Sequence, residues 1–227
     1  DVDILLFEDD VLYVGSDGGI FKAEDSQNIT ANYYTDLSTG IGIKQLYKLG
    51  VAQGEELRIS IGSQDNGTSV YREDTDWQCW IGADGMETFI MDEDNNLIFG
   101  TTQYGNLYKS TNGATTLEGM NEPGPGEGNW VTPFEQGNEN GVIYVGYDQV
   151  YKSINYGNSW GAISQNLGGN LNNLKIAPSN SDVMYATRGY RLYKTIDGGA
   201  TSWVQMAAPG GTITSVAIHP TDANKIA

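Results

Sequence analysis

Residues 153–160 read SINYGNSW, and residues 195–203 read TIDGGATSW. Each stretch follows a Tyr-Lys pair with a small hydroxyl residue, then Asn or Asp, then Gly and finally Trp. Asn or Asp can bond its own backbone in a tight turn, Gly supplies a positive φ, and Trp can pack back onto the strands. The two stretches therefore predict the same hydrogen-bonded turn between strands, used twice.

Related segments recur along the chain at intervals of 50, 37, 43 and 42 residues, ending at Lys22, Arg72, Lys109, Lys152 and Lys194. A period of this size with short strands is the spacing of β-propeller blades. The fourth repeat divides into four strands, 129–136, 141–147, 149–154 and 159–164. We therefore predict an all-β chain that is a single, incomplete propeller over residues 1–227, with five four-stranded blades and the start of a sixth. Another all-β repeat or a sandwich is the alternative.

The pattern Ser/Thr-x-Asp-x-Gly-x-Thr/Ser-Trp is the Asp box, and the chain resembles the Asp-box (BNR-repeat) propeller family here. Asn155 replaces the Asp in one copy, Ser202 is an extra residue in the other, and a degraded copy, STNGATTL, occupies 110–117. The stretches GSDGG, SQDNGT and IAPSNSDVMYA resemble secreted propeller proteins of Bacteroidota with type IX sorting. GSDGGIFK and SQDNG also resemble xyloglucanase-type glycoside hydrolases and sortilin. These resemblances imply an extracellular or cell-surface protein.

The net charge and the ends of the chain indicate which partners to expect. Lys and Arg number 12 against 29 Asp and Glu, a net charge of −17, which disfavours nucleic acid because phosphates need basic side chains. No apolar run is long enough to cross a membrane as a helix, so we expect no membrane insertion. The chain starts at Asp1 and stops within an apolar run, so we expect further domains of a longer chain. Cys79, between Trp77 and Trp80, predicts a buried thiol.

Turns at alternate ends of an up-and-down blade lie on opposite faces. The turns between second and third strands, and the loops between blades, should therefore share the face opposite the Asp boxes. Amides and carboxylates bond sugar hydroxyls there, while aromatic rings cover the apolar side of a pyranose. The predicted ligand-binding residues are Gln64, Asp65, Gln103, Tyr104, Trp130, Tyr147, Asp148, Arg188 and Tyr190.

A catalytic alternative depends on two carboxylates. Asp17 in GSDGG resembles the catalytic Asp of the xyloglucanase segment TDVGG, and Asp84 in GADGM is its candidate partner. Glycoside hydrolysis needs two carboxyl groups roughly 5 to 9.5 Å apart. Asp17 and Asp65 are also residues that tight turns favour for structural reasons.

No metal or organic cofactor is expected. Residues 92–96, DEDNN, space Asp92, Asp94 and Asn96 like calcium ligands, but Leu97 stands where a calcium loop needs Gly, so an acidic turn is expected. The single His and single Cys exclude a cluster of soft ligands.

Three functions follow from these patterns. The preferred one is a non-catalytic module that binds a polysaccharide or a surface protein through its loops. The alternative is a xyloglucanase-like hydrolase that uses Asp17 and Asp84. The third is a purely structural segment of a surface protein.

Overall fold

The computed structural model describes residues 2–16, 18–24, 33–40, 44–54, 56–208 and 210–227, and Asp17 lies outside these ranges. The described residues form five four-stranded sheets and one two-stranded sheet, as predicted. In chain order the strands are β1 (Val2–Glu8), β2 (Val11–Ser16), β3 (Gly19–Ala23), β4 (Thr35–Asp36), β5 (Leu46–Val51), β6 (Arg58–Ser63), β7 (Gly67–Arg72), β8 (Asp76–Ile81), β9 (Thr88–Met91), β10 (Asp94–Thr101), β11 (Leu107–Ser110), β12 (Glu118–Gly119), β13 (Phe134–Gln136), β14 (Ile143–Gly146), β15 (Val150–Ser153), β16 (Gly161–Ala162), β17 (Asn173–Ala177), β18 (Asn180–Arg188), β19 (Arg191–Thr195), β20 (Val204–Met206), β21 (Ile218–His219) and β22 (Asp222–Ile226). One 3-10 helix, η1 (Gln103–Gly105), joins β10 to β11.

Every four-stranded sheet is an antiparallel meander of four consecutive strands. In the fourth sheet, for example, Val145 of β14 pairs with Phe134 of β13 and with Tyr151 of β15. The turn between the second and third strands therefore lies at one end of each sheet, and the turn between the third and fourth strands at the other. This places the sequence-predicted turns at the ends that the strand division requires.

The stretches 153–160 and 195–203 form the hydrogen-bonded turns that the sequence predicted. Ser153 Oγ accepts a hydrogen bond from the Gly157 N–H at 2.8 Å, and Asn155 Oδ1 accepts one from the Ser159 N–H at 2.9 Å. The fifth sheet repeats this pattern, with Asp197 accepting from the Thr201 N–H. The degraded copy at 110–117 makes the same turn, because Asn112 Oδ1 accepts from the Thr116 N–H at 2.9 Å. The turn therefore depends on the short polar side chains more than on the final Trp.

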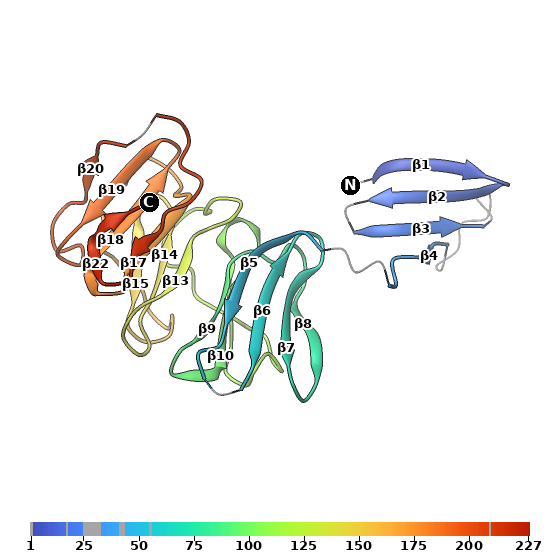
Figure 1. Ribbon diagram of the computed structural model, residues 1–227, viewed down its shortest axis with the longest axis horizontal. Coiled ribbons are helices and arrows are strands. Elements are labelled where there is room, and N and C mark those ends of the chain that lie inside the picture. Colours follow the sequence, from blue (N-terminus) through green and yellow to red (C-terminus); the bar gives the residue numbers. More distant parts are fainter. Residues whose placement is uncertain (1, 17, 25–32, 41–43, 55, 209) are drawn as a thin grey trace.

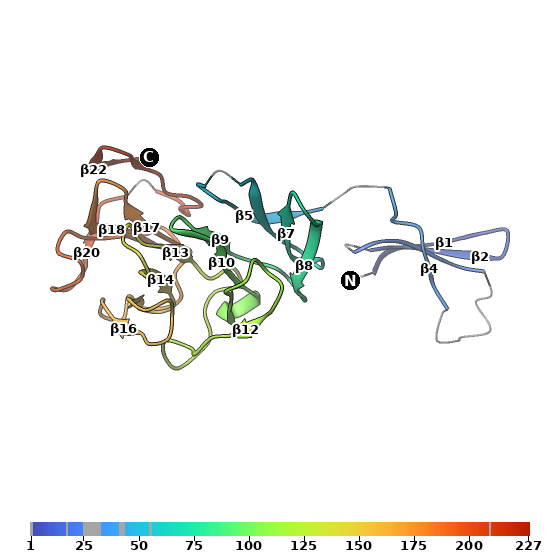
Figure 2. The ribbon, with the colours of Figure 1, turned by 90° about the horizontal axis from the view of Figure 1, so that it is seen from below.

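The sheets from β5 onward pack side by side in chain order (Figures 1 and 2). Each interface between neighbouring sheets has its own buried apolar cluster. Their central residues are Val70, Ile90 and Ile98; Phe99, Phe134 and Ile143; Tyr144, Leu174 and Met184; and Tyr185, Leu192 and Val216. Burying one such side chain contributes about 1.5–3 kcal/mol.

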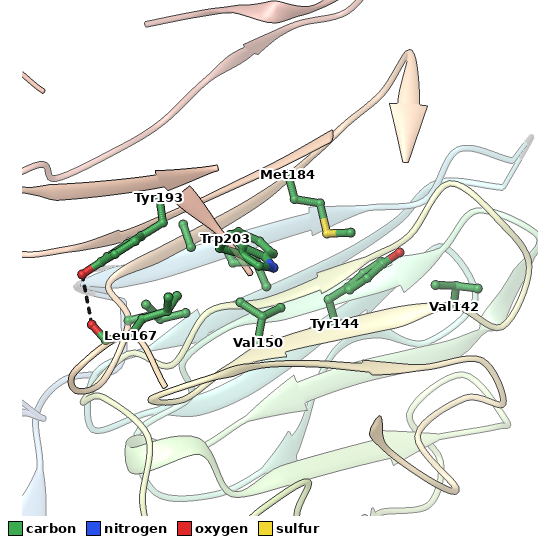
Figure 3. Packing of buried hydrophobic residues seen from close by; sticks show 10 residues of the cluster. Val142, Tyr144, Val150, Leu167, Met184, Tyr193 and Trp203 are labelled. Carbon is green, nitrogen blue, oxygen red and sulfur yellow. Dashed lines mark hydrogen bonds between the residues drawn. The ribbon is translucent and has the colours of Figure 1, made fainter. Parts of the chain in front are cut away.

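Figure 3 shows the interface between the fourth and fifth sheets, where Tyr144 and Val150 face Met184 and Trp203. Trp203 is 3% exposed and donates from Nε1 to the Ile163 carbonyl at 2.8 Å. The Tyr193 hydroxyl donates to the Leu167 carbonyl at 3.0 Å. Trp160, also predicted to be buried, is only half-buried.

The first sheet, β1–β4, stands apart from the others in the structure (Figure 1). Ile4, Leu5, Leu6 and Phe7 of β1 are 55–65% exposed. This differs from the expectation of five blades packed about one axis. The sequence pattern is sufficient for β1–β4 to pair into a sheet, but it does not by itself specify the packing of that sheet against a neighbour.

The prediction of a buried Cys79 is wrong, because this residue is exposed. Alternate residues of a strand face opposite sides. In β8, Trp80 therefore points into the cluster shared with the third sheet, while Cys79 and Trp77 point to the side that the first sheet leaves uncovered.

Candidate functional site

One end of the packed sheets carries the turns between second and third strands and the loops that join the sheets. This surface, called the loop face here, comprises the described residues of 64–66, 82–87, 102–106, 120–133, 147–149 and 189–190. All nine predicted ligand-binding residues lie on it or at its edge. Of the proposed catalytic pair, Asp84 lies on it, and Asp17 is outside the described residues.

An aromatic pair is the most prominent feature of the loop face. The Tyr104 and Trp130 rings meet edge to face, with centroids 5.3 Å apart. Tyr104 is 44% exposed and Trp130 is 39% exposed. Two backbone bonds join their loops, from the Tyr104 N–H to the Trp130 carbonyl and from the Gly128 N–H to the Tyr104 carbonyl. The rings are therefore fixed in place while part of their surface meets solvent.

Tyr47 anchors this pair to the second sheet. The Trp130 Nε1 donates to the Tyr47 hydroxyl at 3.2 Å, and that hydroxyl donates to Gln64 Oε1 at 3.1 Å. The relay connects the Trp130 loop, strand β5 and the turn that contains Gln64, and it orients the indole ring. Tyr47 escaped the sequence analysis because it lies in the innermost strand β5, where no turn signal marks it.

Asp84 is bound into the loop structure. Its Oδ1 accepts a hydrogen bond from the Asp65 N–H at 2.7 Å. Beside it, the Gly67 N–H donates to the Ala83 carbonyl, and the Gly85 N–H donates to the Ser63 carbonyl. A Cβ at Gly85 would lie 2.3 Å from the Gly67 carbonyl oxygen, so the chain passes too closely for a side chain there. The Asp84 carboxylate therefore holds the turn of the second sheet against the following loop.

The remaining predicted residues differ in their exposure. Tyr147 is buried and donates to the Gly105 carbonyl at 2.7 Å, and burial raises the pKa of its hydroxyl. Asp148 accepts from Asn166 Nδ2, and Arg188 donates to the Gly168 carbonyl at 2.6 Å. Tyr190 is exposed, with the guanidinium of Arg191 5.1 Å from its ring centre.

Gln103 is half-buried beside Tyr104, and its Oε1 has no hydrogen-bond partner among the described residues. A buried amide oxygen without a partner costs free energy unless water or a ligand supplies a donor. The oxygen itself is buried, so it is not presented on the surface beside the aromatic pair.

A row of charged side chains lies on the innermost strands and at their loop-face ends, with Glu87 buried and the other three half-buried. Lys48 of β5 pairs with Glu87 at 2.9 Å, and Lys175 of β17 pairs with Glu135 of β13. These four side chains line a cavity of about 260 Å³ together with apolar residues such as Phe89 and Phe134. The cavity opens among residues of the second to fifth sheets.

Glu87 is the strongly perturbed carboxyl group among the described residues. Burial raises its pKa to about 7, and the nearby Glu135 adds to the shift, while Lys48 opposes it. Burial also lowers the pKa of Lys48, but the charge of Glu87 outweighs this effect and the net shift is upward. Such a carboxyl group can hold a proton at neutral pH, which a general acid requires. Glu87 lies in the loop between β8 and β9, and no local signal in the sequence marks its burial.

Among the described residues, no three His, Cys, Asp or Glu side chains gather closely enough to hold a metal ion. The 92–96 stretch forms the tight turn between β9 and β10, where Asp94 Oδ1 accepts from the Asn96 N–H at 2.8 Å. No helix among the described residues is long and apolar enough to span a membrane.

No protein-family model and no curated protein matches the chain. Among solved structures, the fold is similar to that of an ancestral GH74 enzyme, with a TM-score of 0.60 and 16% identity over 90% of this chain and 31% of that chain. It is also similar to the GH74 xyloglucanase from Xanthomonas campestris, with a TM-score of 0.59 and 15% identity over 96% of this chain and 41% of that chain. The chain thus spans less than half the length of either enzyme. At these identities the likeness shows the β-propeller fold alone.

Proposed function

We propose that this chain is a propeller segment that binds a glycan on its loop face without cleaving it. The exposed Tyr104–Trp130 pair, fixed through Tyr47, carries this proposal. An immobilised aromatic surface can cover the apolar side of a sugar ring, and it loses little conformational entropy on binding.

Location and partners form part of the same proposal. The resemblance of its turns to the Asp boxes of secreted propellers supports a place outside the cell or on its surface. A polysaccharide is the preferred partner and a surface protein the other. The net charge of −17 disfavours nucleic acid as a partner.

Calorimetric titration with xyloglucan, mixed-linkage glucan and chitin oligosaccharides tests the binding. Trp130→Ala should weaken binding by roughly tenfold or more, because truncating a central aromatic contact costs about 2 kcal/mol or more. Trp77→Ala is the matched control, since Trp77 is similarly exposed but lies outside the loop face. Equal losses in both variants, or no binding by the unmodified chain, would contradict the proposal.

The second candidate is a glycoside hydrolase. One observation favours it, namely the buried Glu87 carboxyl with its pKa raised to about 7, near a second carboxyl group at Glu135. In the pair predicted from the sequence, Asp17 and Asp84, the Asp84 carboxylate already accepts a hydrogen bond from a backbone N–H. Release of reducing ends from xyloglucan, abolished by Glu87→Gln or by Asp17→Asn with folding intact, would establish this activity instead of simple binding.

A further inference from the structure

In the packed sheets, equivalent positions of the third strand face the preceding and the following sheet. In the third, fourth and fifth sheets, the third strand carries a Tyr that packs toward the preceding sheet: Tyr108, Tyr151 and Tyr193. The residue just before each Tyr packs toward the following sheet: Leu107, Val150 and Leu192. The second sheet follows the same pattern, because Val70, the residue before Tyr71, packs toward the third sheet. Tyr71 must then face the opposite side, where the first sheet would lie.

That side of the second sheet is apolar and uncovered. Val51, Ile59, Tyr71 and Trp77 pair across the four strands and so form one row on this face. Trp77 is 48% exposed, and its ring lies 5.5 Å from that of Tyr71. Leu49, also exposed, lies on the same face one row further along. In the fourth and fifth sheets the equivalent residues of the first three strands are buried, namely Phe134, Val145 and Tyr151, and Leu174, Ala186 and Tyr193.

The first sheet carries the matching face. Phe21 occupies the position of the interface Tyr, so Ile20 before it belongs to the side that packs on the following sheet. Ile20 pairs with Gly15, which pairs with Ile4, and the next row contains Leu6 and Tyr13. Ile4, Leu6 and Ile20 are all exposed in the structure.

Charge adds an independent match. In the second, third and fifth sheets, the residue after the interface Tyr donates a hydrogen bond to a residue of the next sheet. Arg72 donates to the Gly113 carbonyl, Lys109 to Asn158 Oδ1 and Lys194 to Asn224 Oδ1, at 3.0, 2.9 and 2.7 Å. Lys22 holds this position in the first sheet but pairs with Glu24 of its own sheet. The corresponding turn of the second sheet, 73–76, reads EDTD, so an acidic turn would meet Lys22.

We propose that the apolar face of β5–β8 is a docking surface for this chain's own first sheet, β1–β4. The open arrangement in Figure 1 then closes by continuing the interface that the other sheets share. Residues 37–45 connect the first two sheets. The connections between the other four-stranded sheets are 82–87, which is shorter, and 120–133 and 163–172, which are longer. The first connection therefore falls within the range of lengths that join packed sheets. This inference is independent of the proposed glycan binding.

A disulfide trap tests the closure. Gly15 and Val51 are the register equivalents of Ser60 and Thr88, whose side-chain oxygens lie 2.5 Å apart across the interface of the second and third sheets. In a Cys79→Ser background, Gly15→Cys combined with Val51→Cys should oxidise to a cross-linked monomer with loss of both thiols. The control pairs Val51→Cys with Leu5→Cys, since Leu5 lies on the opposite face of β1 and should stay reduced.

A monomeric cross-link in the first pair alone supports the proposal. A disulfide-linked dimer would show that a second copy supplies the first sheet and would overturn it, as would equal cross-linking in both pairs. If the variants misfold, small-angle scattering of the unmodified chain decides, because a compact chain of this length has a radius of gyration of about 17 Å. A clearly larger radius for a monomer would leave the first sheet open and overturn the proposal.

Discussion

In the fifth sheet Leu174, Met184 and Ala186 are fully buried, whereas in the first sheet Leu5, Leu6 and Phe7 are each more than half exposed. Both sheets are four-stranded antiparallel meanders with the same strand order. Strand pairing is satisfied within each sheet by backbone hydrogen bonds. The apolar side chains of a sheet are buried only when another sheet packs against each of its faces. The fifth sheet has such a neighbour on both faces, whereas no sheet packs against the described residues of the first. The repeat therefore encodes the blade, while stability comes from the interfaces between blades.

The largest effect should come from Trp203→Ala in the fifth sheet. Removing this buried indole should lower the free energy of unfolding by about 3–5 kcal/mol, because it leaves a cavity between two sheets. Trp77→Ala should cost no more than about 0.5 kcal/mol if the first sheet stays open. Urea unfolding measures both variants. A cost for Trp77→Ala close to that of Trp203→Ala would mean that the first two sheets are packed like the others.

Glu87 should make the packed sheets sensitive to pH. The pKa of its carboxyl group is about 7 in the folded chain, against an ordinary value of 4.5, so the folded state binds more protons between these values. Its contribution to stability is therefore fully present below about pH 4.5 and is lost as the pH rises through 7, a change of up to about 3 kcal/mol. Glu87→Gln should remove this slope from unfolding curves measured across pH. The exposed Glu118→Gln should keep it, and an unchanged slope in Glu87→Gln would contradict the assignment.

A smaller effect should come from the turn of the fourth sheet. Ser153→Ala leaves the buried Gly157 N–H without its side-chain acceptor, which should cost about 1–3 kcal/mol. The first sheet has Ala23 at this position, so Ala23→Ser is the matched reverse change. Thermal unfolding should show a loss in the first variant and little change in the second. A clear gain from Ala23→Ser would mean that the first sheet can form the same turn.

The smallest effect should come from Lys22→Glu. An exposed ion pair contributes little to stability, so the global free energy of unfolding should hardly change. If the first sheet closes on the acidic 73–76 turn, the variant should shift the equilibrium toward the open form and increase quenching of Trp77 fluorescence by acrylamide, most clearly at low salt. Quenching that is unaffected at every salt concentration would show that Lys22 does not face that turn.

The candidate site was only partly visible in the sequence. Turn alternation and the loops between blades predicted that Tyr104 and Trp130 would share one face, and their rings do meet in the structure. Their edge-to-face contact joins two separate loops, and the hydrogen bond from Trp130 to Tyr47 joins residues 83 positions apart, so no local signal reports either contact. Tyr147 resembled Tyr104 in its position after a second strand, yet it points inward to the Gly105 carbonyl.

The sequence by itself determined the blade repeat, the four-strand division and the turns of Ser153, Asn112 and Asp197. These features depend on residues close together in the chain, namely alternating apolar strands, glycines at positive φ and short polar side chains that bond to the backbone four residues on. Only the tertiary structure decided that Cys79 is exposed, that Glu87 is buried beside Lys48, and that the first sheet stands apart. Each of these depends on what lies against a face of a sheet, and that is set by contacts between distant segments.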